Sequence, residues 1–409
     1  GAFEVGKEIG RGGMGAVYLA HHISDDVDVA LKVLGDMQPD MEHTFDLEVQ
    51  AMARLNHPSI AMVVDAGRLD GDVSKSLHVL ANSPWIAMEF VDGDELTALR
   101  GEMSWDEIHD FTLGVLEALG HSHSLGVVHR DIKPQNIIVG RTFDGRVAPK
   151  LVDFGIALPI EELELTGGDP TDHTIMGTPK YMAPEQVAAA WSVQGPPTDL
   201  YSLACVIWEL TTGRPPFKGG SPYVVMIAHV NDPPPPFKPS LPVPSGLEGW
   251  LRRLLMKQPM ERFRRAADAA YAFRQLGDAV PDMSDDEATE VEEDGNTVKV
   301  LHQHQMALEM PKVSSGWKSS YDRPPIPAVA FERGESRMTL VGSGLGLVGL
   351  RTMPLVGRSK ERHALWQALV EADQTGTPQA VVLRGPAGVG KSRLAEWFSR
   401  HADEVGGAQ

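Results

Sequence analysis

Cysteine is almost absent from this chain, which has a single copy, Cys205, among 409 residues. One cysteine excludes an intrachain disulfide. It lies in the apolar stretch 203–208, where we expect it to be a small buried side chain. A chain without disulfides is typical of a reducing compartment, so the sequence favours a cytoplasmic location.

Long apolar runs and an excess of positive charge are also missing. A helix that crosses a bilayer needs ~20 mostly apolar residues, and the nearest candidate, 340–350, is short and rich in glycine. The formal net charge of -19 argues against nonspecific nucleic-acid binding and against docking on anionic membranes. We therefore expect neither nucleic acid nor a membrane among the partners of this fragment.

The length of the chain supports two or three domains with real cores. Apolar alternation predicts strands over 4–19 and 27–34, and helical spacing predicts a helix over 40–55. Residues 101–276 are predicted to be mainly helical, with a helix beginning near Ser104. These segments form the first predicted domain, residues 1–276.

The pattern breaks down over 277–353, which we predict to be a disordered linker. Residues 282–294 contain eight carboxylates and no Lys or Arg, and a solvating tether is favoured over a regulatory role for them. The second predicted domain is 354–409, with helices over 361–371 and 391–401 and a strand over 380–383. Because the chain opens inside a predicted strand and stops soon after this domain begins, we interpret it as a fragment cut at both ends.

The eight residues HRDIKPQN at 129–136 place an acid, a cation and an amide on one short loop. Asp131 can orient a hydroxyl, Lys133 can meet a phosphate, and Asn136 can hold a magnesium ion. Phosphoryl transfer needs these parts and little covalent chemistry from the protein. The loop therefore indicates a phosphotransferase.

A glycine pattern near the start of the chain supports this interpretation. Gly10, Gly12 and Gly15 fit the spacing G-x-G-x-x-G-x-V, between strands that would make a hairpin lid over phosphates. Lys32 follows inside the apolar strand VALK, where a lysine is costly unless paired. Glu48, in the next predicted helix, is the expected partner, and a lysine so held can grip the α- and β-phosphates.

Two further motifs follow in order. The residues MEFVDG at 88–93 lie where two lobes would be joined, so that backbone groups near Met88, Glu89 and Val91 can meet adenine. The residues DFG at 153–155 then supply a second magnesium ligand, Asp153. GTP at 177–179 and APE at 183–185 close the segment that follows.

Residues 1–276 resemble a Hanks-type, eukaryotic-like Ser/Thr protein kinase domain of the bacterial kind. The resemblance implies an α+β bilobal fold, with a β-rich first lobe and a helical second lobe. It implies that Lys32 and Glu48 form the active-state ion pair and that Asp131 accepts or orients the proton of the substrate hydroxyl. Lys133 and Thr178 then indicate Ser/Thr rather than Tyr substrates.

The same resemblance implies a nucleotide site. Asn136 and Asp153 would hold Mg²⁺, with Mn²⁺ as the alternative ion. The adenine would be enclosed by Val17, Ala30 and Ile138, with Met88 as gatekeeper, and the ribose would meet Glu95. ATP is the expected cosubstrate, and proteins are the expected substrates.

Regulation by phosphorylation is also implied, with self-association for trans-autophosphorylation. Thr166, Thr171 and Thr174 are the candidate phosphosites, and the sequence leaves the choice among them open. Glu185 and Arg262 are expected to pair as a structural clamp. The alternative interpretation is a pseudokinase that serves as a scaffold, and a third makes the kinase accessory to a nucleotide switch.

A second phosphate motif lies near the end of the chain. The residues GPAGVGKS at 385–392 match G-x-x-x-x-G-K-[ST], between a predicted strand and a predicted helix. Phosphates would meet the backbone of Gly385, Gly388 and Gly390, with Lys391 on the β- and γ-phosphates and Ser392 on the metal. This part resembles the opening of an AAA-like or STAND-type ATPase. It has no room for a later catalytic acid, so we expect no hydrolysis here.

Three weaker patterns are better explained by ordinary structural roles than by function. His121 and His123 are predicted to be packed or capping side chains rather than metal ligands. The proline cluster 233–236 is predicted to be a loop within the domain rather than a ligand for SH3-type modules. The glycines of 344–349 lack the helix that a nucleotide site would need.

Overall fold

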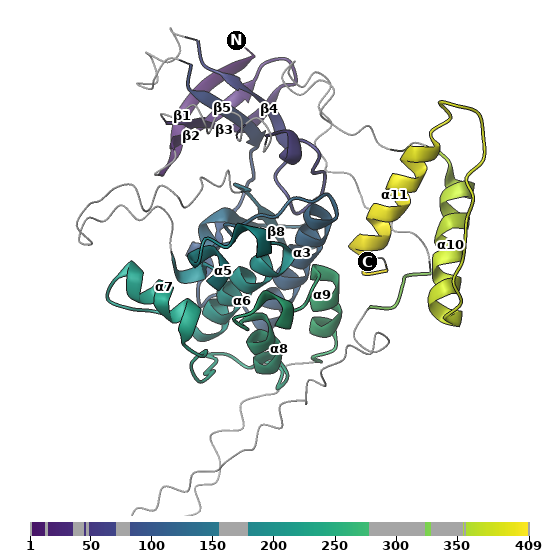
Figure 1. The fold of residues 1–409 in the computed structure, drawn as a ribbon. Coiled ribbons are helices and arrows are strands. Elements are labelled where there is room, and N and C mark those ends of the chain that lie inside the picture. Colours follow the sequence, from purple (N-terminus) through teal and green to yellow (C-terminus); the bar gives the residue numbers. More distant parts are fainter. Residues whose placement is uncertain are drawn as a thin grey trace, which may run out of the picture.

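The computed structural model describes residues 2–12, 15–35, 45, 49–70, 82–154, 179–277, 324–328, 355 and 357–407. Its first part has a small lobe built on a sheet and a larger lobe of helices, joined through 90–93 (Figure 1). The predicted bilobal α+β fold is confirmed. Within the predicted helix over 40–55 the structure describes 45 and 49–55, of which 45 and 49–52 are helical and 53–55 are not.

The small lobe contains an antiparallel sheet of five strands in the order β1-β2-β3-β5-β4. These strands are β1 (Phe3–Gly12), β2 (Gly15–His22), β3 (Val27–Leu34), β4 (Val63–Arg68) and β5 (Pro84–Glu89). The predicted strand over 27–34 is β3 itself, and the prediction over 4–19 covers most of β1 and β2.

Alternation along β2 and β3 divides the sheet into two faces. One face makes the small-lobe core, which contains Ala16, Tyr18, Ala20, Val29, Leu31 and Val33. The alternate residues Val17, Ala30 and Lys32 are only partly buried. Lys32 reaches Asp153 of the large lobe, so this second face looks onto the cleft between the lobes.

The large lobe is built around two long helices, α3 (Trp105–Ser124) and α6 (Pro196–Thr212). Around them pack α5 (Pro184–Val187), α7 (Pro222–Asn231), α8 (Leu247–Leu254) and α9 (Ala266–Arg274). The predicted helix start is confirmed, because Ser104 and Glu107 form a reciprocal capping box.

Helix α6 is buried on nearly all sides, and from Thr198 to Thr211 its residues are inaccessible. Cys205 lies fully buried within it, as predicted. Burial raises the pKa of the Cys205 thiol well above its ordinary value, so this cysteine is an inert packing residue.

A small sheet of the large lobe lies next to the loop 129–136. Its strands are β6 (Asp94–Glu95), β7 (Ile137–Arg141) and β8 (Val147–Leu151), in that order. The short 3-10 helix η2 (Pro134–Asn136) leads directly into β7. Residues 125–136 are therefore fixed at both ends, by α3 before them and by this sheet after them.

The C-terminal part consists of α10 (Ser359–Thr375) and α11 (Lys391–Glu404). Both predicted helices are confirmed, but the predicted strand over 380–383 is wrong, since these residues take no regular structure. A strand is held by ladder hydrogen bonds, and the described residues offer this segment no pairing strand. Val382 is accordingly 72% exposed.

The predicted linker falls outside the described residues except for Gly277 and 324–328. The short piece 324–328 is not loose. Ile326 is buried in a cluster with Trp366 and Val370 of α10, and the Trp366 indole Nε1 donates to the Pro327 carbonyl at 2.7 Å. Prediction of disorder is therefore wrong for these residues, because apolar contacts hold them.

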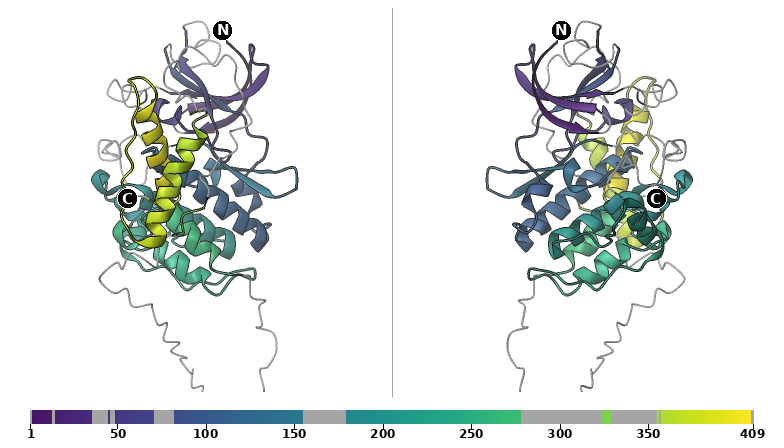
Figure 2. Two further views of the ribbon diagram at one scale, coloured as in Figure 1. Left: turned by 90° about the vertical axis from the view of Figure 1, so that its right-hand side faces the viewer. Right: turned by 90° about the vertical axis from the view of Figure 1, so that its left-hand side faces the viewer.

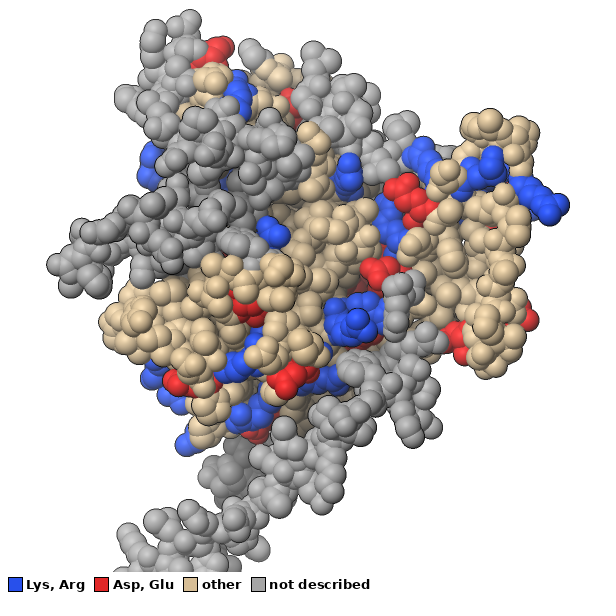
Figure 3. All heavy atoms as spheres, in the orientation of Figure 1, with Lys and Arg blue, Asp and Glu red and all other residues tan. Residues whose placement is uncertain are grey.

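On the face of the large lobe seen in Figure 3, basic and acidic side chains lie interspersed, so this face has no large patch of one charge.

Among the described helices, none combines the length and the apolar character needed to cross a bilayer. The two C-terminal helices stand beside the large lobe, on the side of α3 and α9 (Figure 2).

Candidate active site

The loop that follows α3 is held by one buried carboxylate, Asp199, from the first turn of α6. Its Oδ2 accepts from the backbone N–H of His129 at 2.8 Å, and its Oδ1 accepts from that of Arg130 at 2.7 Å. Arg130 has φ of 62°, a costly conformation that persists where surrounding bonds enforce it. Asp199 supplies those bonds.

The charge on Asp199 is maintained although the residue is fully buried. Burial opposes ionisation, but the hydrogen bond with His123 at 2.8 Å and the imidazoles and backbone N–H around it outweigh burial, so the pKa of Asp199 is lowered. His123 is thus a packed, hydrogen-bonded residue, as predicted.

His129 is buried beneath the loop, and its two ring nitrogens have different partners. Nε2 lies 3.2 Å from the Val152 carbonyl, and Nδ1 accepts from the Asp131 N–H at 3.3 Å. This pattern requires a neutral ring with its proton on Nε2. Burial lowers the pKa of His129 and favours that form. The ring also contacts Phe154, with centroids 4.5 Å apart.

Asp131 is the centre of the polar cluster in the cleft. Its Oδ2 accepts from Lys133 Nζ at 2.7 Å and from Asn136 Nδ2 at 2.8 Å. Asn136 Nδ2 also donates to the Asp131 carbonyl at 2.8 Å. The carboxylate is oriented from behind but remains 42% exposed. It can therefore accept a proton from a hydroxyl that enters the cleft.

Lys32 and Asp153 connect the two lobes across the cleft. Lys32 Nζ lies 2.9 Å from Asp153 Oδ1. Asp153 has φ of 53°, a conformation that residues other than glycine rarely adopt. The predicted partner of Lys32, Glu48, lies outside the described residues, as do Gly155 and Thr178. The candidate phosphosites Thr166, Thr171 and Thr174 are outside them too.

The predicted adenine residues come from three strands that face the cleft. Val17 pairs in register with Lys32, and Ala30 pairs with Met88 at the end of β5. Ile138 pairs with Glu95 across β6 and β7, so these two approach from the large lobe. The predicted adenine residues thus lie on strands of both lobes.

The segment 90–93 carries the backbone between the lobes beside these strands. The Glu89 side chain is turned away to an ion pair with Lys150 and to the Met62 N–H at 3.3 Å, so only its backbone carbonyl can face a base. A Cβ at Gly93 would come within 2.7 Å of the Val139 carbonyl. Glycine is therefore needed where this segment crosses β7.

β1 ends at Gly12 and β2 begins at Gly15, with Gly12 opposite Gly15 and Gly10 opposite Val17, while 13 and 14 lie outside the described residues. Gly15 has φ of 147°, and a Cβ there would lie 2.0 Å from the Val33 carbonyl. A Cβ at Gly12 would meet nothing within 4 Å. Gly15 is thus required by the sheet, whereas a side chain at Gly12 would have open space around it.

The predicted clamp between Glu185 and Arg262 is confirmed. Arg262 donates from Nη1 to Oε1 at 2.7 Å and from Nη2 to Oε2 at 2.8 Å, with both side chains buried. Near it, Gln186 Nε2 donates to the Arg130 carbonyl at 2.7 Å. Sequence reasoning gave no role to Gln186 or Asp199, because both lie far along the chain from the loop that they hold.

A divalent metal ion fits the oxygens of this cleft. The two bonds made by Asn136 Nδ2 leave its carbonyl oxygen for another partner, and Asp153 presents a carboxylate. Magnesium is usually bound by one or two carboxylates together with substrate phosphates rather than by an all-protein cage. Within the described ranges, no cluster of three or more His, Cys, Asp and Glu could hold a metal alone, in keeping with that arrangement.

The second phosphate loop lies at the start of α11. Gly385, Gly388 and Gly390 all have positive φ, from 79° to 159°, so the loop takes a conformation that favours glycine. Lys391 Nζ donates to the carbonyls of Gly385 at 2.9 Å and Pro386 at 2.7 Å, and Ser392 is exposed. The lysine that would meet phosphate is turned onto its own loop.

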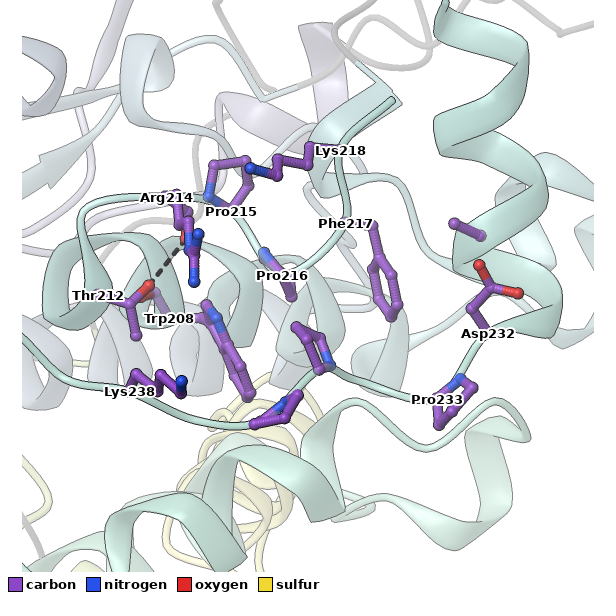
Figure 4. A pocket seen from close by; sticks show the side chains of 13 residues that line it. Trp208, Thr212, Arg214, Pro215, Pro216, Phe217, Lys218, Asp232, Pro233 and Lys238 are labelled. Carbon is purple, nitrogen blue, oxygen red and sulfur yellow. Dashed lines mark hydrogen bonds between the residues drawn. The ribbon is translucent and has the colours of Figure 1, made fainter. Parts of the chain in front are cut away.

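A cavity of about 320 Å³ lies away from both phosphate motifs, under the loop that follows α7 (Figure 4). Pro233, Pro235 and Pro236 of the proline cluster line this cavity, together with Trp208 and Phe217. Arg252 donates to the carbonyls of Pro234 and Pro235 at 3.2 and 3.0 Å. The prolines thus form a packed loop of the domain, as predicted, and the cavity is distant from the chemistry.

Comparison with known proteins gives two family matches. The model of the protein kinase domain matches residues 3–269, and that of an AAA ATPase domain matches residues 354–408.

Named relatives match over the first part of the chain. A probable serine/threonine-protein kinase of Streptomyces coelicolor is 36% identical over 65% of this chain and 38% of its own length. The serine/threonine-protein kinase PknB of Mycobacterium leprae is 37% identical over 65% and 41%. PknF of Mycobacterium tuberculosis is 36% identical over 68% and 57%. The chain thus spans about two fifths of the first two relatives.

Proposed function

The chain belongs to the protein kinase family, and on that premise we propose that it transfers the γ-phosphoryl group of ATP to serine and threonine hydroxyls of proteins. The observation that carries this proposal is the cluster at Asp131, where Lys133 and Asn136 orient a carboxylate that is still open to the cleft. Relatives named as Ser/Thr kinases support the substrate class.

In the proposed reaction, Asp131 and Lys133 have different roles. Asp131 orients the attacking hydroxyl and receives its proton as the oxygen forms its bond to the γ-phosphorus. The bond between that phosphorus and the β–γ bridging oxygen breaks, and ADP leaves with the electron pair. Lys133 lies beside Asp131 and would stabilise charge on the transferred group.

Protein kinases use ATP together with a divalent metal ion, and we propose Mg²⁺ rather than Mn²⁺ here. Asn136 and Asp153 would hold it, and when bound it would neutralise phosphate charge. Lys32 would move from Asp153 onto the α- and β-phosphates, and Glu48 would then be its partner. The glycines Gly10, Gly12 and Gly15 would cover the phosphates through their backbone N–H groups.

The base and the ribose would lie between the lobes. We assign the adenine to Val17, Ala30 and Ile138, with Met88 at the back of the site. The backbones of Glu89 and Val91 would bind its edge, and Glu95 would meet the ribose.

We assign the specificity for Ser and Thr hydroxyls to Lys133 and Thr178. The proposed substrates are proteins, including a second copy of this chain.

We place the enzyme in the cytoplasm as the catalytic head of a longer signalling protein. The loop at Gly385, Gly388, Gly390, Lys391 and Ser392 would bind nucleotide phosphates.

The test is transfer of labelled phosphate from ATP to a general protein substrate, followed by acid hydrolysis and separation of the phosphoamino acids. We expect phosphoserine and phosphothreonine, in Mg²⁺ at least as efficiently as in Mn²⁺. Label on phosphotyrosine alone would contradict the assigned specificity. Absence of transfer while ATP is bound would point to the scaffold alternative.

A further inference from the structure

The helix that begins at the second phosphate loop ends on the kinase domain. The last turn of α11 packs on α3, and Glu404 Oε1 lies 2.8 Å from His121 Nδ1 and 3.3 Å from Ser124 Oγ. The Glu404 side chain is only 5% exposed and that of His121 11%. A carboxylate so buried is costly unless it is paired, so this contact is specific rather than incidental.

The turn after α11 extends the same interface. Gly406 has φ of 78°, and a Cβ there would meet Pro324 at 2.8 Å and Asp268 of α9 at 3.4 Å. Asp403 interacts electrostatically with Arg265 and His123, and burial raises its pKa. The end of α11 thus lies near both histidines of α3, with Glu404 at His121 and Asp403 interacting with His123.

His121 links this carboxylate to the small lobe. Its Nε2 accepts from the Asn56 backbone N–H at 3.3 Å, and its ring is stacked on that of His57, with centroids 5.5 Å apart. A ring that donates to Glu404 through Nδ1 and accepts through Nε2 must be neutral, with its proton on Nδ1. Glu404 therefore selects the tautomer that can hold Asn56.

The segment held by His121 runs to the cleft. Its residues Ser59 and Ala61 exchange backbone hydrogen bonds with Leu151, each at 2.9 Å. Leu151 is the last residue of β8, two positions before Asp153. Contacts therefore connect Glu404, through His121 and the segment 56–61, to the strand end that presents Asp153 to Lys32.

We propose that α11 is a regulatory arm, which positions the segment 56–61 through Glu404 and His121 and responds to phosphate bound in the loop at Lys391. An α-helix of 14 residues is a stiff rod about 20 Å long. Phosphate would draw Lys391 away from the carbonyls of Gly385 and Pro386. Because the helix is stiff, a displacement of its first turn at Lys391 also moves its last turn, where it loosens the contact of Glu404 with His121. Glu404 is thus a positioning residue for the proposed kinase reaction.

Amide hydrogen exchange of the full chain tests the positioning role without any need for kinase activity. Glu404→Ala should speed exchange at Asn56 about tenfold, because His121 loses the partner that fixes its tautomer. Glu404→Gln retains an acceptor oxygen and should exchange at close to the wild-type rate. Glu396→Ala, on the exposed face of the same helix, is the matched control and should change nothing. Equal exchange at Asn56 in Glu404→Ala and wild type would overturn the proposal.

The phosphate input is tested in a Lys32→Ala chain, which disables the kinase nucleotide site. Added ATP should speed exchange at Asn56 there, and Lys391→Ala should abolish that response. No response to ATP, or a response that survives Lys391→Ala, would refute the arm. Because this readout is independent of phosphoryl transfer, a failed kinase proposal and a failed arm give different results.

Discussion

At the scale of single residues, the site depends on two backbone positions that a chain adopts reluctantly. Arg130 and Asp153 both have positive φ, and each stands next to a group with a proposed chemical role. Asp199 holds the first through two backbone N–H groups, and Lys32 pairs with the second. Conformational cost at these positions is offset by bonds from distant segments, which pre-organises the cleft before substrate arrives.

A buried histidine makes the stability of the large lobe sensitive to acid. Burial first, and then the charge of Lys257, lower the pKa of His229 to about 3 from the ordinary 6.5. The folded protein keeps this ring neutral, while the unfolded chain binds a proton below pH 6.5. The unfolding free energy should therefore be fully present above pH 6.5 and fall by about 1.4 kcal/mol per pH unit below it.

Urea unfolding at pH 7.5 and pH 5.0 measures this effect. The loss of stability between the two should be smaller by about 2 kcal/mol in His229→Gln than in wild type. His363→Gln, at an exposed position of α10, serves as the control and should behave as wild type. An unchanged loss in His229→Gln would show that this ring does not carry the acid sensitivity.

Which single residues could be predicted depended on how close their partners lie in sequence. The motif at 129–136 placed Asp131, Lys133 and Asn136 correctly together, because their contacts are local. Asp199 and Gln186 were missed, since the backbone groups they hold belong to a loop far earlier in the chain. The residues proposed to act in phosphoryl transfer form a short sequence motif, whereas the residues that hold the backbone of that motif are scattered along the chain.

At the scale of elements, two glycines at the ends of β1 and β2 differ in the space around them. A side chain at Gly15 would clash with β3, whereas a side chain at Gly12 would meet no neighbour. Gly15→Ala should disrupt the hairpin, because the added methyl group would lie 2.0 Å from the Val33 carbonyl. We expect a lower melting temperature and an ATP KM raised by an order of magnitude or more. Gly12→Ala is the matched control, with nothing within 4 Å, and should leave the melting temperature unchanged. Equal loss of stability in the two variants would contradict this assignment.

The buried ion pair of Glu185 and Arg262 ties α5 to the segment before α9. Removing one partner leaves the other charged and buried, so Glu185→Ala should cost about 3–5 kcal/mol of unfolding free energy. The double variant Glu185→Ala with Arg262→Ala should cost clearly less than the sum of the two single changes, Glu185→Ala and Arg262→Ala. Thermal unfolding of the four proteins gives the coupling. Strict additivity would mean that the pair does not act as a unit.

Elements were predicted where local pattern and tertiary packing agree. Strand β3 alternates because one face packs in the small-lobe core and the other looks onto the cleft, and Ser104 begins α3 with a capping box. The segment 380–383 has the same apolar character, yet it forms no strand. Sequence can show that a segment suits a sheet, but whether a neighbouring strand is there to pair with it is a property of the fold.

At the scale of the whole molecule, α11 packs on α3 of the large lobe, and the turn that follows it lies against Asp268 of α9. The sequence predicts a disordered linker over 277–353. Instead, 324–328 packs against α10, and Glu404 reaches His121. An acid and a histidine so far apart in the chain leave no sequence pattern that would predict their contact. The proposed regulatory arm would explain these contacts, because they connect the loop at Lys391 to the strand end at Asp153.

The most direct test of the central claim is autophosphorylation of this chain with labelled Mg-ATP, beside Asp131→Asn and Lys391→Ala. Loss of the carboxylate at Asp131 should lower the rate by about 10²–10⁴, because general base catalysis is removed. Lys391→Ala should still be labelled, because Lys391 lies outside the kinase cleft. Label on wild type and Lys391→Ala but almost none on Asp131→Asn would support a working kinase centred on Asp131. Equal labelling of Asp131→Asn, or no label on wild type with ATP bound, would contradict it.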